Sequence, residues 1–218
     1  MRRTTASAFA LALFSACFLT VWAGEGEGRW DAVRRVADGD TLELVDGRLV
    51  RLIGVNAPEI DHENRMAEPR ALEARGFLAG AVASGGIRLE YDVEKQDRHG
   101  RTLAWVFLPD GRLLNELLLR EGLAYCLPTT PNLKYENRLL AAQRAAMAEG
   151  KGIWKDLREN PSARYTGNLR SRRFHLATCP DARRIAPRNR VSFASLREAF
   201  FAGFAPDRDC LPAEKKPF

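Results

Sequence analysis

Cysteine is scarce in this chain, and long hydrophobic runs are almost missing. The 218 residues include four cysteines, and one of them, Cys17, lies in an apolar run near the N-terminus. The C-terminal part keeps just enough cysteines for one bridge, from Cys179 to Cys210, which would leave Cys126 as an odd thiol. Outside the N-terminal run, no segment is long and apolar enough to cross a membrane.

The N-terminal run itself predicts an export signal. Two arginines at positions 2 and 3 precede apolar residues 6–22, and small and acidic residues follow at 23–28. A charged start, an apolar centre and a small-residue cleavage zone are typical of a secretory signal, here residues 1–23 with cleavage near Ala23. The alternative is an uncleaved anchor, for which the run is short. We therefore expect a secreted or periplasmic protein without stable membrane association after cleavage.

Charge is distributed unevenly along the chain. Residues 24–163 carry 20 Lys and Arg against 23 Asp and Glu, a net charge of −3, whereas residues 164–218 carry 12 against 5, a net charge of +7. A basic tail on a near-neutral body suits a protein that holds a polyanion. The alternative is a charged surface that only keeps the protein soluble.

Three short segments place charged groups beside turns. They are residues 38–41 (Asp-Gly-Asp-Thr), 51–59 (Arg-Leu-Ile-Gly-Val-Asn-Ala-Pro-Glu) and 97–101 (Asp-Arg-His-Gly-Arg). Each has a purely structural interpretation: a hairpin turn whose glycine tolerates a positive φ, an arginine in an apolar strand that needs an anionic partner, and a solvated loop. Together they supply oxygen ligands for a hard cation, a carboxylate for a water and two arginines for a phosphate, which indicates phosphodiester hydrolysis.

In this order and at these spacings, the segments resemble the staphylococcal nuclease (thermonuclease) family, whose pattern runs D-G-D-T, R-L-x-G-x-[DN]-x-P-E and D-x-x-G-R. The resemblance continues through residues 111–124 and a helical stretch ending at 152–154, so it covers roughly residues 30–154. It implies a five-stranded OB-fold β-barrel with packed helices. It also implies a calcium-dependent endonuclease that hydrolyses phosphodiester bonds in DNA, RNA or both.

The resemblance assigns roles to four residues. Asp40 matches a calcium-ligating aspartate, and Glu59 matches the glutamate that positions or deprotonates the attacking water. Arg51 and Arg101 match the two arginines that bind the phosphate and stabilise its transition state. These residue types suit the chemistry, because calcium prefers carboxylate and carbonyl oxygens and a planar guanidinium fits phosphate better than lysine does.

One position departs from the best-known members of the family. Asn56 stands where they carry a second calcium-ligating aspartate, and an amide oxygen can ligate calcium but brings no charge. We therefore expect weaker metal binding. His99, where some members have a tyrosine, is interpreted as a solvated loop residue. The competing hypotheses are a catalytically weak or inactive OB-fold protein that binds nucleic acid, and an envelope structural protein in which the motifs are only turns.

The order of elements predicts an α+β fold. Short strands separated by turn signals occupy residues 30–107, interrupted by a helix at 67–84, and further helices are expected at 115–121 and 135–150. We divide the chain into a thermonuclease-like domain (28–157), a linker (158–165) and a C-terminal module (166–212), and we expect a monomer.

The C-terminal module resembles the small zinc-binding domain of the Ada DNA-repair protein, whose ligands are arranged as C-x3-C and, about thirty residues later, C-x2-C. The four matching positions hold His175, Cys179, Asp207 and Cys210, all of which can ligate Zn²⁺. Export favours a different outcome, because an oxidising compartment would join Cys179 to Cys210. Zinc and disulfide stay open at this point, with the disulfide preferred.

Overall fold

The computed structural model describes residues 30–61, 66–83 and 85–211 of the chain. The predicted export signal at residues 1–23 lies outside these ranges. In the part of the chain that the structure describes, no helix has both the length and the apolar character needed to cross a membrane.

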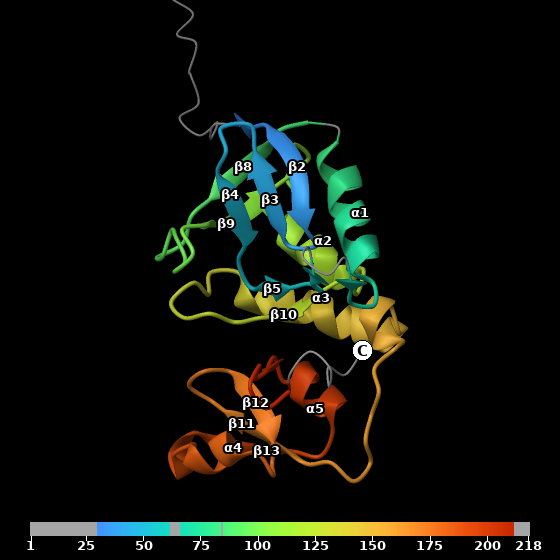
Figure 1. The fold of residues 1–218 in the computed structure, drawn as a ribbon, viewed down its shortest axis with the longest axis vertical. Helices are drawn as coiled ribbons and strands as arrows, with labels where there is room; N and C mark the ends of the chain where they lie inside the picture. Colours follow the sequence, from blue (N-terminus) through green and yellow to red (C-terminus); the bar gives the residue numbers. More distant parts are fainter. Residues whose placement is uncertain (1–29, 62–65, 84, 212–218) are drawn as a thin grey trace, which may run out of the picture.

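A six-stranded sheet is the centre of the N-terminal part, residues 30–157. Its strands are β1 (Trp30–Asp31), β2 (Val33–Asp38), β3 (Thr41–Leu44), β4 (Leu49–Leu52), β8 (Ile87–Glu90) and β9 (Thr102–Phe107). The order across the sheet is β1-β8-β9-β4-β3-β2. β4 pairs antiparallel with β3 and parallel with β9. The sheet curls into a half-barrel (Figure 1), so the α+β class is confirmed, whereas a closed five-stranded barrel stays a prediction.

The helices of this part are α1 (Ala71–Val82), α2 (Leu114–Arg120) and α3 (Glu136–Glu149), followed by the short 3-10 helix η1 (Gly152–Trp154). α1 and α2 pack against the sheet, and α3 packs against α2 and β10 (Tyr125–Cys126). Apolar side chains from sheet and helices share one core, in which Leu42 and Val50 of the sheet join Leu78, Leu118 and Leu139 of the three helices. The second and third helices match the predicted ranges to within one residue at each end.

The first helix begins later than predicted. Residue 67 belongs to strand β7 (Met66–Ala67), which pairs with β6 (Ile60–Asp61). A helix through this point is disfavoured, because Pro69 restricts the backbone of the residue before it. α1 starts only after Arg70, whose φ of 66° is left-handed. The predicted start at Ala67 was therefore wrong by four residues.

The C-terminal module is built on a second sheet. Its strands are β11 (Tyr165–Asn168), β12 (Arg173–Leu176), β13 (Arg190–Phe193) and β14 (Ala205–Pro206), in the order β13-β11-β12-β14. The helices are α4 (Pro180–Arg184), η2 (Pro187–Asn189) and α5 (Leu196–Phe201). A disulfide joins Cys179 to Cys210. The likeness to the Ada domain stays a prediction.

The module is docked on the N-terminal part through a shared core, with α3 between the first sheet and the module (Figure 1). Phe200 of α5 packs against Trp154 and Tyr125, with ring centroids 5.2 Å and 5.5 Å apart. The side chain of Gln143 bridges the two parts: its Nε2 donates to the Phe200 carbonyl at 2.6 Å, and its Oε1 accepts from the backbone N–H of Cys126 at 2.6 Å. The fully buried position of Gln143 makes both bonds costly to break.

Candidate active site

The sheet brings the three charged segments together. In the β3–β4 pairing Thr41 lies opposite Arg51, and in the parallel β4–β9 pairing Arg51 lies opposite Leu103, two residues after Arg101. A cleft of about 530 Å³ opens beside these strands, and its lining includes Arg51, Glu59 and Arg101. The three residues predicted to be catalytic therefore face one cavity, although they come from segments up to 50 residues apart.

Arg51 is the buried arginine whose partner the sequence left open, and that partner is Asp40. Arg51 Nη2 lies 2.8 Å from Asp40 Oδ2 and donates to Asn56 Oδ1 at 3.2 Å. Its Nη1 donates to the carbonyls of Leu52 and Val55, both at 2.9 Å. Four of the five guanidinium hydrogens are thus engaged, which leaves Nε as the donor without such a bond among the described residues.

Asp40 is held from three sides. Its Oδ2 accepts from the backbone N–H of Ala57 at 2.9 Å as well as from Arg51, and its Oδ1 accepts from the Thr41 hydroxyl at 3.1 Å. The neighbouring Gly39 has no positive φ, contrary to our interpretation of the turn. A Cβ there would lie 2.7 Å from the Cβ of Ala57 and 2.9 Å from that of Ala74, so the glycine is needed for close packing of the 38–41 turn.

Asn56 lies in β5 (Val55–Asn56), which pairs with β10 (Tyr125–Cys126). Its Nδ2 donates to the hydroxyl of Tyr125 at 3.1 Å and to the Ala57 carbonyl at 3.2 Å. These bonds turn Oδ1 toward Arg51, where one of its two lone pairs is used and the other remains for a cation. Burial raises the pKa of Tyr125 well above its ordinary value, so this phenol stays a neutral donor or acceptor.

Glu59 carries the most perturbed carboxyl of the cleft. Its pKa is raised from 4.5 to about 7, chiefly by desolvation and further by the negative charge of Asp40 and a hydrogen bond with Asp38, while Arg51 acts in the opposite direction. Crowding of three carboxyls favours a bound cation, because a divalent ion would offset their repulsion. The donor set of carboxylate and amide oxygens is also the set that Ca²⁺ prefers. Asp40, Asn56 and Glu59 therefore fit such an ion.

Arg101 is oriented by the loop that precedes it. Its Nε donates to Asp97 Oδ2 at 2.7 Å, while Asp97 Oδ1 accepts from the backbone N–H groups of His99 and Arg101 at 2.9 Å and 3.0 Å. Burial alone would raise the pKa of Asp97, but these bonds lower it below its ordinary value. The terminal nitrogens of Arg101 remain for a ligand in the cleft. His99 is exposed, as expected of a loop residue.

Comparisons with known proteins show the family of this chain. The family model "Staphylococcal nuclease homologue" matches residues 49–156. Thermonuclease of Staphylococcus hyicus is 41% identical over 127 residues, which cover 57% of this chain and 75% of that protein. The chain belongs to the staphylococcal nuclease family. Thermonuclease of Staphylococcus intermedius is 40% identical over 126 residues, 56% of this chain and 74% of that protein.

Similarity to one larger relative of the nuclease family extends further. Endonuclease YhcR of Bacillus subtilis (strain 168) is 31% identical over 222 residues, which cover 89% of this chain and 18% of that protein. Since 89% of 218 residues is about 194, the match leaves out only about 24 residues and must run into the C-terminal module. The module therefore has a counterpart, at least in part, in a second nuclease.

The C-terminal residues predicted to bind zinc or form a disulfide lie together on the module of this nuclease-family chain. His175 Nδ1 is 3.2 Å from Cys210 Sγ and 3.6 Å from Asp207 Oδ1. The ligand atoms of His175, Cys179 and Cys210 all lie within 4.8 Å of one another. His175, Cys179 and Cys210 are thus compatible with the disulfide that the structure contains and, when it is reduced, with a metal, and Asp207 lies beside His175.

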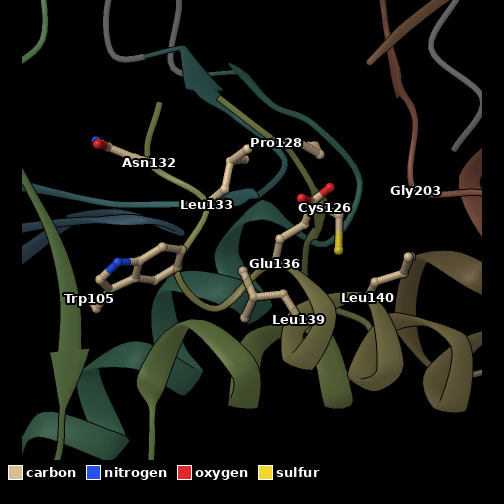
Figure 2. A pocket seen from close by; sticks show the side chains of 10 residues that line it. Trp105, Cys126, Pro128, Asn132, Leu133, Glu136, Leu139, Leu140 and Gly203 are labelled. Atoms are coloured by element: carbon tan, nitrogen blue, oxygen red, sulfur yellow. The ribbon is translucent and has the colours of Figure 1, made fainter. Parts of the chain in front are cut away.

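A second, smaller pocket lies where the nuclease-family part meets the module. Figure 2 shows Trp105, Leu139 and Cys126 around it, with Gly203 of the module at one side. Its lining is almost entirely apolar, and burial raises the pKa of the Cys126 thiol far above its ordinary value. This apolar pocket lacks the charged groups that phosphodiester hydrolysis requires. The larger cleft is therefore the candidate active site of the nuclease-family chain.

Sequence reasoning missed several residues of the site. Tyr125 holds Asn56, Asp97 orients Arg101, and Arg173 and Arg208 of the module line the same cleft as Arg51. For Asp97 a signal existed, because an aspartate four residues before an arginine across a glycine turn suits a side-chain clamp. For the other three the contacts depend on tertiary packing.

The pKa of Glu59 makes a prediction about stability in metal-free buffer. Because the folded state holds this proton up to about pH 7 and the unfolded state releases it near 4.5, stability falls as pH rises through that window. Glu59→Gln should therefore gain stability relative to the parent between pH 4.5 and pH 8. Since solvent reaches and screens the carboxyl, we expect roughly 2–4 °C in melting temperature, measured in EDTA.

Asp110→Asn provides a control of opposite sign. The backbone N–H of Arg112 holds the pKa of Asp110 below its ordinary value. Removing the Asp110 carboxylate should therefore lower the stability of the protein as pH rises, whereas Glu59→Gln should raise it. A Glu59→Gln profile parallel to that of the parent would mean that the carboxyl is solvated normally.

Proposed function

We propose that the protein is an exported, calcium-dependent nuclease that cleaves DNA, RNA or both. Its relatives are named thermonucleases and endonucleases, and the chain is a hydrolase that acts on nucleic-acid phosphodiester bonds. The observation that carries the proposal is the convergence of Arg51, Glu59 and Arg101 on one cleft. Export is supported by the N-terminal sequence alone. The proposal keeps the division into domain (28–157), linker (158–165) and module (166–212).

In this proposal Asp40 and Asn56 would hold a calcium ion, which would lower the negative potential of the site and polarise the phosphate. The carboxylate of Glu59 takes a proton from the attacking water, whose oxygen bonds to phosphorus while the bond to the leaving oxygen breaks. Arg101 donates to the phosphate oxygens with its terminal nitrogens, and Arg51 through Nε or by exchanging one of its present partners. Such preorganised donors are the expected main source of rate enhancement.

Conservative changes at the three cleft residues should remove activity without unfolding the protein. Arg51→Lys, Glu59→Gln and Arg101→Lys should each lower kcat/KM on single-stranded DNA with calcium by at least about a hundredfold. Arg112→Lys is a matched control for Arg101→Lys, because Arg112 makes the same pair of bonds to Asp110 at 2.7 Å and 3.0 Å outside the cleft.

Near-parental activity of a folded Arg51→Lys protein would show that Arg51 is not catalytic. A large drop in the melting temperature of this variant would indicate that Arg51 forms a structural ion pair instead. If the parent cleaves nothing with calcium but retains DNA in a salt-sensitive manner, the protein is a binding module rather than an enzyme.

Asn56 allows a direct test of the metal ligands. Asn56→Asp adds a charged oxygen at the same position, so it should lower the calcium concentration needed for half-maximal cleavage. Asn56→Ala should raise that concentration. An unchanged calcium requirement in both variants would show that the residue is not a ligand.

The disulfide is preferred over zinc in the module. It is supported by the bonded pair Cys179–Cys210 and by the predicted export. The intact mature protein should gain the mass of two hydrogens on reduction and contain no stoichiometric zinc. One equivalent of zinc with both thiols free would overturn this choice, and His175 and Asp207 would then complete the ligand set.

A further inference from the structure

The cleft is lined by two arginines of the module as well as by the residues of the nuclease fold. These are Arg173, the first residue of β12, and Arg208, two residues after the end of β14. The two strands pair in parallel, with Arg173 opposite Ala205. The module sheet thus brings both side chains to the wall of a cavity that also contains Arg51.

Arg173 is held at this wall by a bond to the nuclease part of the chain and a bond within the module. Its Nη1 donates to the carbonyl of Pro128 at 3.1 Å and to that of Ser171 at 3.1 Å. The residues on either side of Pro128 both line the cleft. Phe174, the next residue of β12, points the other way into the shared core and is fully buried. The guanidinium is therefore placed by a rigid element.

Within the described part of the chain, no acid lies in ion-pair contact with either arginine of this pair, Arg173 or Arg208. The neighbouring Asp207 is engaged by the backbone of Cys210 at 3.2 Å and by His175. Burial lowers the pKa of Arg173; Tyr125 and Asp207 oppose that shift, and the like charge of Arg208 adds to it. Two cations in this arrangement favour a bound anion.

We propose that Arg173 and Arg208 form a second phosphate site, which binds a backbone phosphate of the nucleic-acid strand whose scissile phosphate lies at Arg51 and Arg101. The inference rests on the proposed function. Planar guanidinium groups suit phosphate oxygens, and the Nη1 bonds of Arg173 to carbonyls leave its Nε and Nη2 for a ligand. The module is then a part of the substrate site rather than a separate binding domain.

Arg208→Gln is the cleanest test, because this side chain is exposed and should not be needed for folding. Arg188→Gln is the matched control: it removes one exposed arginine of the same module outside the cleft. Binding of a fluorescein-labelled 12-nucleotide single strand to the full mature chain is measured by anisotropy in EDTA over a series of salt concentrations. Arg208→Gln should weaken binding about five- to tenfold and reduce the salt slope by about 0.7.

Arg173→Gln should give a similar loss, with its melting temperature measured beside it. Equal affinities and slopes for Arg208→Gln and Arg188→Gln, or a parent that does not bind the strand, would overturn the second site. If Arg173→Gln lowers the melting temperature without weakening binding of the strand, Arg173 only stabilises the interface between the two parts, and the proposed two-arginine phosphate site is refuted. A parent that binds with the expected slopes but never cleaves would refute the nuclease function and leave the arginine site standing.

Discussion

The buried ion pair between Arg51 and Asp40 fixes the geometry on which the rest of the site depends. Both side chains are about nine-tenths buried, and their charged atoms are 2.8 Å apart. Charges in such a place have lost most of their hydration, so each is tolerable only while the other is present. Removing one partner of a buried pair typically costs about 3–5 kcal/mol. Because the pair joins the turn before β3 to β4, and further bonds reach Val55 and Ala57, it fixes Arg51 at the wall of the cleft relative to the 38–41 turn and the 55–57 segment.

The module supports the same geometry through a chain of contacts that starts at Arg51. Arg51 bonds to Asn56, Asn56 bonds to the Tyr125 hydroxyl, and the Tyr125 ring packs against Phe200 of the module. Gln143 adds a second connection, since one amide joins the backbone of β10 to that of α5. The residue proposed as a calcium ligand is thus supported by a core to which the module contributes most of the buried residues. The module and the nuclease fold therefore stabilise each other through this shared core.

Local patterns allowed much of this to be predicted, and packing explains the rest. An arginine in an apolar strand required an anion, and Asp40 supplies it. The helices at 115–121 and 135–150 followed from periodicity. By contrast, Asn56 and Tyr125 are 69 positions apart, and Arg173 and Pro128 are 45 apart. Periodicity predicts which face of an element is buried, but not which element covers it. Gly39 was recognised as a turn residue for the wrong physical reason: its φ is not positive, and a Cβ there would crowd Ala57 and, in α1, Ala74.

The distribution of charge explains why a basic module is useful beside this cleft. Three carboxyls stand close together, at the expense of an unfavourable position for Glu59, and they repel any polyanion that approaches. Arg51 is largely committed to Asp40 and Asn56, and Arg101 to Asp97. These arginines can serve the phosphate under attack but have little capacity for its neighbours along the strand. A continuous strand can stay beside such an acidic centre only if further cations face it, and the module's cleft arginines are placed to provide them.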